Sequence, residues 1–146
     1  MRAVIQRVTS ASVSVAGAEI ARIGNGILAL VAVAADDTQD VLEWMAKKIV
    51  ELRIFDDADG RLNLSLLDVR GQLLLVSQFT LYGDCRKGRR PSYSDAAPPA
   101  RAQEIYDRFV QTVRQWIPDV QTGQFQATME VELVNSGPVT LIIDSR

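Results

Sequence analysis

The stretch that decides the fold is residues 24–33, which read GNGILALVAV. Its glycine-rich start is typical of a tight turn, and the apolar run at 27–33 predicts a buried strand. The spacing of apolar residues then changes, and Asp37 or Thr38 can cap a helix. One face of that helix is expected to be apolar, made of Val41, Leu42, Met45, Ile49 and Leu52. This order is typical of a helix packed on a sheet.

Further strands are predicted on both sides of this unit. Apolar and polar residues alternate in residues 2–15, as they do in half-buried strands. Residues 72–76 form an apolar strand that leads into Ser77, and residues 56–60 (DDADG) predict a turn. Residues 83–99 contain three of the five prolines and most of a basic cluster, so an irregular loop is expected there.

The C-terminal part predicts a second helix and a hairpin. Pro98 and Pro99 can open a helix whose apolar face consists of Ala102, Ile105, Tyr106, Phe109, Val113 and Trp116. The tail alternates over residues 129–133, is expected to turn at residues 135–138, and returns as residues 139–144. The predicted fold class is α+β: a strand-rich, barrel-like sheet covered by two main helices, with a C-terminal β-hairpin.

The composition restricts the chemistry that this chain can perform. The 146 residues are 47% apolar and 23% charged, which predicts one globular domain over residues 1–146. No histidine is present, so Ser-His-Asp hydrolases, Cys-His hydrolases and histidine-based metal sites are excluded. Cys85 is the only cysteine and cannot form an intramolecular disulfide. We expect neither a metal nor an organic cofactor.

The chain also lacks the sequence features of secretion and membrane insertion. Its start has no long apolar segment, and the longest apolar run, residues 27–35, is far shorter than the roughly 20 residues of a membrane helix. We expect a cytoplasmic protein with no membrane partner. The net charge of −2 means that any binding to nucleic acid depends on a local basic patch.

Two polar strings follow apolar segments and are the candidate functional sites. Residues 77–81 (SQFTL) end a strand, where side-chain and backbone donors can stabilise an oxyanion. The alternative is an ordinary strand end whose hydroxyl is bonded locally. Residues 135–140 (NSGPVT) fit a plain hairpin turn, or a turn with a cis Gly137–Pro138 bond that presents neighbouring carbonyls on one side.

Together with further landmarks, these strings resemble the D-aminoacyl-tRNA deacylase (D-tyrosyl-tRNA deacylase) family. The landmarks are residues 1–8 (MRAVIQRV), 52–55 (LRIF), 63–65 (NLS) and 90–93 (RPSY), so the resemblance extends from end to end. It implies a deacylase-type fold, a homodimer with active sites at the subunit interface, and hydrolysis of the ester that joins a D-amino acid to tRNA.

The resemblance implies catalytic roles for residues of the first string. Ser77, Gln78 and Phe79 are expected to hold the aminoacyl group, while backbone N–H groups near Phe79 and Thr80 bind the oxyanion. Thr80 is the alternative nucleophile, but the chain offers no histidine base for it. The family's mechanism relies instead on the 2′-OH of the terminal adenosine, which suits a chain without histidine.

The resemblance also implies that the second string, residues 135–140, performs chiral proofreading. By resemblance, Gly137–Pro138 is a cis dipeptide that reaches into the partner's pocket and rejects L side chains, and Arg7 holds it in position. Met129 is expected near the pocket, while Tyr93 either lines it or only packs the neighbouring loop. Rejection of a side chain cannot exclude glycine, so some hydrolysis of glycyl-tRNA is expected.

The remaining predictions concern tRNA binding and the alternatives. Arg86, Lys87, Arg89 and Arg90 either form a solvated loop or, as the resemblance favours, contact tRNA phosphates. Ser136 and Gln126 depart from the usual acidic residue and glycine of the family, which leaves the substrate range open. A different, Thr80-dependent esterase and a non-catalytic tRNA-binding module are the alternative functions.

Overall fold

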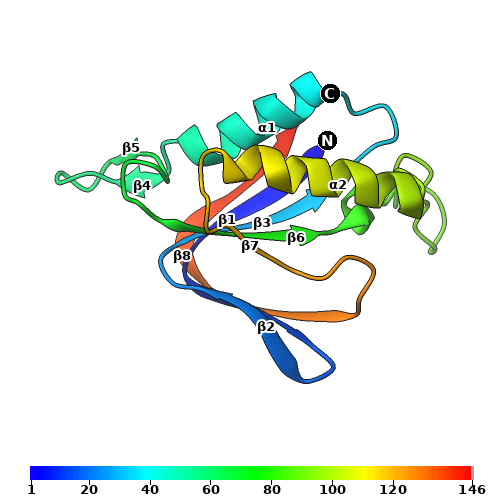
Figure 1. Ribbon diagram of the computed structural model, residues 1–146, viewed down its shortest axis with the longest axis horizontal. Coiled ribbons are helices and arrows are strands. Elements are labelled where there is room, and N and C mark those ends of the chain that lie inside the picture. The colour runs from blue at the N-terminus through cyan, green and yellow to red at the C-terminus, as the bar shows by residue number, and fades with distance from the viewer. Residues whose placement is uncertain (146) are drawn as a thin grey trace.

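The computed structural model describes residues 1–145 and has an α+β fold built on a strongly curved sheet (Figure 1). Strand β1 (Arg2–Val15) is central, because it is long enough to pair with three other strands. Its first half pairs with β3 (Gly26–Ala32) and its second half with β2 (Ala18–Ile23), both antiparallel. The strands predicted at residues 2–15 and 27–33 are confirmed.

The sheet continues beyond β3 through parallel strands. β6 (Gln72–Ser77) pairs with β3, and the short β7 (Gln121–Thr122) pairs with β6, which gives the order β2-β1-β3-β6-β7. The backbones of β3 and β6 meet closely at Gly26, where a Cβ would lie only 1.9 Å from the carbonyl oxygen of Gln72. This close contact explains why β3 begins with glycine.

Helices α1 (Gln39–Glu51) and α2 (Pro99–Arg114) lie together on one face of the sheet (Figure 1). The main core lies between the helices and the sheet. It includes Leu42, Met45 and Ile49 of α1 and Ile105, Tyr106, Phe109 and Val113 of α2. Both predicted helices are thereby confirmed. Trp116 was wrongly placed on the buried face, because it follows the end of α2 and is exposed.

The start of α1 differs from the predicted capping. Thr38 occupies the N-cap position, but its side chain makes no capping hydrogen bond. Asp37 is buried, and its carboxylate accepts hydrogen bonds from the N-terminal ammonium of Met1 at 2.6 Å and from the N–H of Ala34 at 2.8 Å. Asp37 therefore ties the beginning of β1 to the start of the helix.

The predicted C-terminal hairpin is wrong. Residues 129–144 form one strand, β8 (Met129–Asp144), which runs antiparallel to β1 along almost its whole length. The register shifts where Val8 is opposite Asn135 and Gln6 is opposite Thr140, so residues 136–139 bulge out of the ladder opposite Arg7. Asn, Gly and Pro suit a bulge as well as a turn, and only the pairing with β1 distinguishes them.

The curved half of the sheet is nearly closed, like a barrel, on the side away from the helices (Figure 1). A second core fills it, with Val8, Val13, Ile23, Leu28 and Leu74 among its buried members. A small hairpin of β4 (Phe55–Asp56) and β5 (Leu62–Leu64) contains the predicted turn and projects from one end of the molecule (Figure 1). Within residues 1–145, neither helix is long and apolar enough to cross a bilayer.

Candidate active site

The first polar string lies where β6 ends and the chain reverses. The N–H of Gln78 donates to the carbonyl of Val31 at 2.7 Å, which fixes the end of β6 against β3. Residues Phe79–Tyr82 then form a short 3₁₀ helix, η1. The N–H groups of Phe79 and Thr80 belong to its first turn, where no acceptor exists within the helix. Two backbone donors are therefore placed directly after the buried strand.

A cleft of about 990 Å³ opens beside this strand end. It lies between the ends of β3 and β6, the beginning of α2 and the segment that leads into β8. Five predicted site residues line it: Ser77, Gln78, Phe79, Tyr93 and Met129. The rest of the lining is Ala32, Val33, Val76, Ser94, Ala96, Ala97, Pro98, Pro99, Ala102, Phe125, Gln126, Ala127 and Val131.

Thr80 is close to the cleft but does not line it. Its side-chain oxygen accepts a hydrogen bond from the amide nitrogen of Gln78, and the residue is exposed. Phe79 and Tyr93 face each other edge to face, with ring centroids 5.2 Å apart. A Cβ on Gly83 would lie 3.0 Å from the Tyr93 ring, so Tyr93 also contacts the chain that follows η1. The two aromatic side chains thus form one wall of the cleft.

No residue that lines the cleft in the described chain is charged at neutral pH. Among residues 1–145 there is also no group of three or more cysteine, aspartate or glutamate side chains placed to hold a metal ion. Beneath the lining, the hydroxyl of Tyr106 donates to the carbonyl of Leu75 at 3.0 Å, and burial raises the pKa of this phenol. The polar groups that the cleft itself offers are hydroxyls, amides and backbone atoms.

The basic loop, residues 84–92, lies next to the cleft, and its two ends are paired with each other. Asp84 and Ser92 pair through two backbone hydrogen bonds of 2.8 and 3.0 Å. Arg86 donates to both carboxylate oxygens of Asp84, which lowers the pKa of Asp84 to about 2. Arg89 and Arg90, like Lys87, are exposed on the same loop. The paired ends of the loop therefore hold several cationic side chains in solvent, beside a cleft that has no charged side chain.

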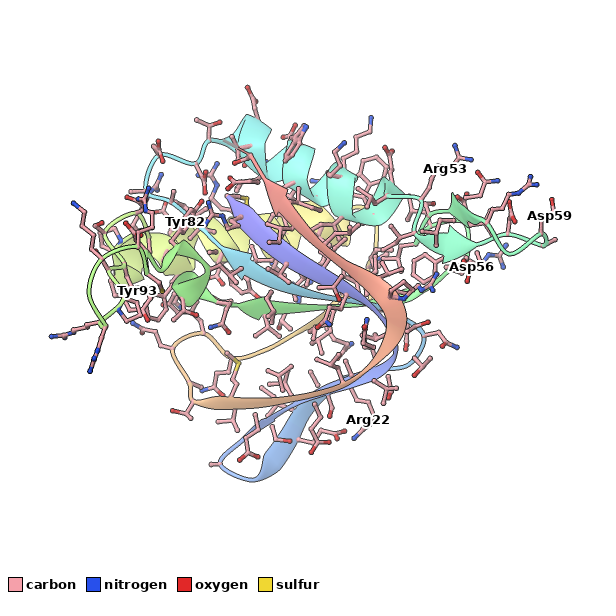
Figure 2. The ribbon with its side chains drawn as sticks, turned by 180° about the vertical axis from the view of Figure 1, so that it is seen from behind. Arg22, Arg53, Asp56, Asp59, Tyr82 and Tyr93 are labelled. Carbon is pink, nitrogen blue, oxygen red and sulfur yellow. The ribbon has the colours of Figure 1, made fainter. Side chains whose placement is uncertain are left out.

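The second polar string does not line the cleft of its own chain. Gly137 and Pro138 are exposed in the bulge of β8, and the peptide bond between them is cis. The buried side chain of Arg7 donates to the carbonyl oxygen of Ser136 at 3.2 Å. Figure 2 shows how far apart the two regions are: Tyr93 marks the cleft and Asp56, a neighbour of Arg7, lies at the opposite end of the molecule.

Sequence reasoning missed several residues of the cleft, of which Phe125 is the largest. Its ring packs against Tyr106, with centroids 6.2 Å apart. The available signal was a single aromatic residue in the polar segment before β8. Gln126 lies beside it with φ of +61°, in the left-handed region that favours glycine. This backbone geometry suits the glycine that the resemblance leads us to expect at that position, where this chain has Gln126.

Comparison with known proteins agrees with the geometry. The family described as "D-Tyr-tRNA(Tyr) deacylase" matches residues 4–144. A protein of Fervidobacterium nodosum named D-aminoacyl-tRNA deacylase is 58% identical over 146 residues, which is all of this chain and 98% of that protein. A protein of Thermosipho africanus with the same name is 56% identical over the same proportions.

Solved structures give the same result for the fold. A protein described as "c-Myc DNA Unwinding Element Binding Protein" superposes with a TM-score of 0.95 at 41% identity, covering 100% of this chain and 99% of that chain. A probable eukaryotic D-amino acid tRNA deacylase superposes with a TM-score of 0.86 at 19% identity, covering 97% of each, and supports the fold alone. From the family match and the full-length relatives, the chain belongs to the D-aminoacyl-tRNA deacylase family.

Proposed function

We propose that this protein hydrolyses the ester bond of D-aminoacyl-tRNA and releases free tRNA and the D-amino acid. The main observation that supports this proposal is the uncharged cleft at the end of β6, next to a loop of exposed cationic side chains. The cleft suits a small aminoacyl group, and the loop suits the phosphates of the tRNA to which that group is attached. Family membership agrees with this pairing.

Water is the nucleophile in the proposed reaction. It adds to the ester carbonyl, the N–H groups of Phe79 and Thr80 stabilise the oxyanion, and the C–O bond to the ribose then breaks. One proton of the water leaves on the ribose oxygen, the other passes to solvent, and the amino acid leaves as its carboxylate. Because the cleft has no charged side chain, the 2′-OH of the terminal adenosine takes part in proton transfer, as the family resemblance implies. Ser77 and Gln78 hold the aminoacyl group.

The active form is proposed to be a homodimer. Val134 and Ile142 of β8 are 57% and 73% exposed, the two highest values among the large apolar side chains of the described residues. Leu141 on the same strand is also exposed. A second copy that covers this strand buries apolar surface and brings its Gly137–Pro138 bulge into the first copy's cleft. The separation of cleft and bulge within one chain supports this arrangement.

Chiral proofreading then works by rejection. The Gly137–Pro138 carbonyls of the second copy occupy the space that an L side chain needs, whereas a D side chain points elsewhere. Met129 and Tyr93 form other parts of the wall. Since glycine has no side chain to reject, glycyl-tRNA is a substrate as well. Complete inertness towards glycyl-tRNA at high enzyme concentration would contradict pure rejection.

The decisive test compares D-tyrosyl-tRNA and L-tyrosyl-tRNA with the purified protein in EDTA. We expect rapid release of tyrosine from the D ester alone. Equal loss of both esters would indicate a general esterase, or a Gly137–Pro138 filter that does not work. Binding of tRNA with no loss of either ester would favour the non-catalytic tRNA-binding module.

A further inference from the structure

Arg7 connects two segments that are far apart in the sequence. Its guanidinium donates from Nε to the carbonyl of Ser136 at 3.2 Å, and from Nη1 to the carbonyl of Ile54 at 2.8 Å. The same Nη1 lies 3.3 Å from a carboxylate oxygen of Asp56. One buried side chain thus joins the β8 bulge to the base of the β4–β5 hairpin.

Asp56 is the one acidic partner of Arg7 among the ion pairs of the described residues. The side chain of Arg7 is 10% exposed, so its charge is largely removed from water and requires a hydrogen-bonded partner. Asp56 is itself half exposed, which reduces its value for overall stability. We therefore expect the Asp56 carboxylate to influence the position of the Arg7 guanidinium more than the stability of the fold.

The other side of the bulge is held independently of the hairpin. The side-chain amide of Asn135 donates to the carbonyl of Arg7 at 2.9 Å and to the carbonyl of Val139 at 3.0 Å. Gly137 and Pro138 therefore lie between two supports, one from Asn135 and one from Arg7. These two hydrogen bonds do not involve Asp56, so we expect a change at Asp56 to shift the bulge without removing it.

We infer that Asp56 is a positioning residue that acts through Arg7 on the Gly137–Pro138 bulge and sets how strictly L-aminoacyl esters are rejected. This inference rests on the proposed rejection of L side chains by that bulge. Steric rejection depends steeply on distance, so a small displacement of the bulge admits L side chains. The D ester does not rely on that contact, and its turnover is largely preserved.

The test uses the full-length protein with Asp56→Asn, which keeps the size of the side chain and removes its charge. We expect kcat/KM for L-tyrosyl-tRNA to rise about tenfold, the size expected from losing one charged hydrogen bond, while D-tyrosyl-tRNA changes less than about threefold. Asp56→Glu restores the charge and should return part of the discrimination. Asp59→Asn is the matched control, since Asp59 lies in the same hairpin and pairs with the exposed Arg61 at 4.0 Å.

Two results would overturn the inference. Unchanged discrimination in Asp56→Asn would show that Arg7 does not need this carboxylate for positioning. A parallel loss of D and L turnover, with a lower melting temperature, would show a merely structural role. Failure of the proposed function is distinguishable, because the unmutated protein would then not prefer the D ester at all.

Discussion

The cleft at the end of β6 and the bulge of β8 are built in different ways. The cleft follows a strand whose residues Leu73–Val76 are at most 1% exposed, and its edge is held by a backbone hydrogen bond to β3. The bulge lies at the surface and is held by the side chains of Arg7 and Asn135. One chain forms this cleft, whereas in the proposed dimer the bulge acts on the cleft of the second copy. In that proposal, the groups for hydrolysis and the groups for selection come from different parts of the chain.

The largest effect is expected at the bulge, from Gly137→Ala. The added Cβ would meet only the Asn135 side chain, at an ordinary 3.5 Å, so the fold of one chain is retained. In the proposed dimer the methyl group enters the partner's cleft and misplaces the substrate. We expect kcat/KM for D-tyrosyl-tRNA to fall about 100-fold with an unchanged melting temperature.

Gly24→Ala is the control for this change, because its Cβ would meet only the flexible end of Gln72, at 3.3 Å. It should leave turnover unaltered. If Gly137→Ala also retains the turnover of the unmutated protein, the bulge does not enter a partner's cleft. The proposed division of roles between cleft and bulge would then be wrong.

A smaller effect is expected from the loop beside the cleft. Charge reversal of Arg89 and Arg90 should raise the KM for tRNA about tenfold and reduce the slope of log KM against log salt by about 2, since two phosphate contacts are lost. The control reverses Lys47 on α1 and Arg114 at the end of α2, which changes the net charge equally. An unchanged KM and salt dependence after reversal of Arg89 and Arg90 would place the tRNA elsewhere.

Thr80→Val distinguishes water from Thr80 as the nucleophile. The change removes the acceptor of the Gln78 amide, and loss of one neutral hydrogen bond should lower kcat about fivefold. A nucleophile would instead cost about 10⁴-fold or more with binding intact. Thr38→Val is a suitable control, because the Thr38 side chain makes no capping bond. A near-total loss confined to Thr80→Val would support the Thr80-dependent esterase.

The smallest effect concerns the base of the basic loop. Because Arg86 lowers the pKa of Asp84 from 3.8 to about 2, this pairing stabilises the folded loop above pH 4 and is lost as the pH falls from 4 to 2. An NMR titration of the Asp84 carboxyl should show the low midpoint, and Arg86→Gln should return it towards 3.8. Activity at pH 7 should hardly change. A midpoint near 4 in the unmutated protein would contradict the pairing.

Much of the fold and part of the site could be predicted from the sequence. Alternating or continuous apolar residues indicated β1, β3 and β6, and apolar spacing indicated α1 and α2, because local periodicity reports which face is buried. The polar pair Ser77 and Gln78 at the end of a buried strand indicated the segment that lines the cleft, whereas a role for Phe79 was implied only by the family resemblance. The absence of histidine restricted the chemistry through composition alone.

Only the tertiary structure decided which segments meet. It placed the tail along β1 as one bulged strand, and it brought Ile54, Asp56 and Ser136 to the side chain of Arg7. It also separated the Gly137–Pro138 bulge from the cleft of the same chain. Periodicity and turn residues are local properties, whereas strand pairing and the partners of a buried charge depend on contacts between distant residues, here at least 47 positions apart around Arg7.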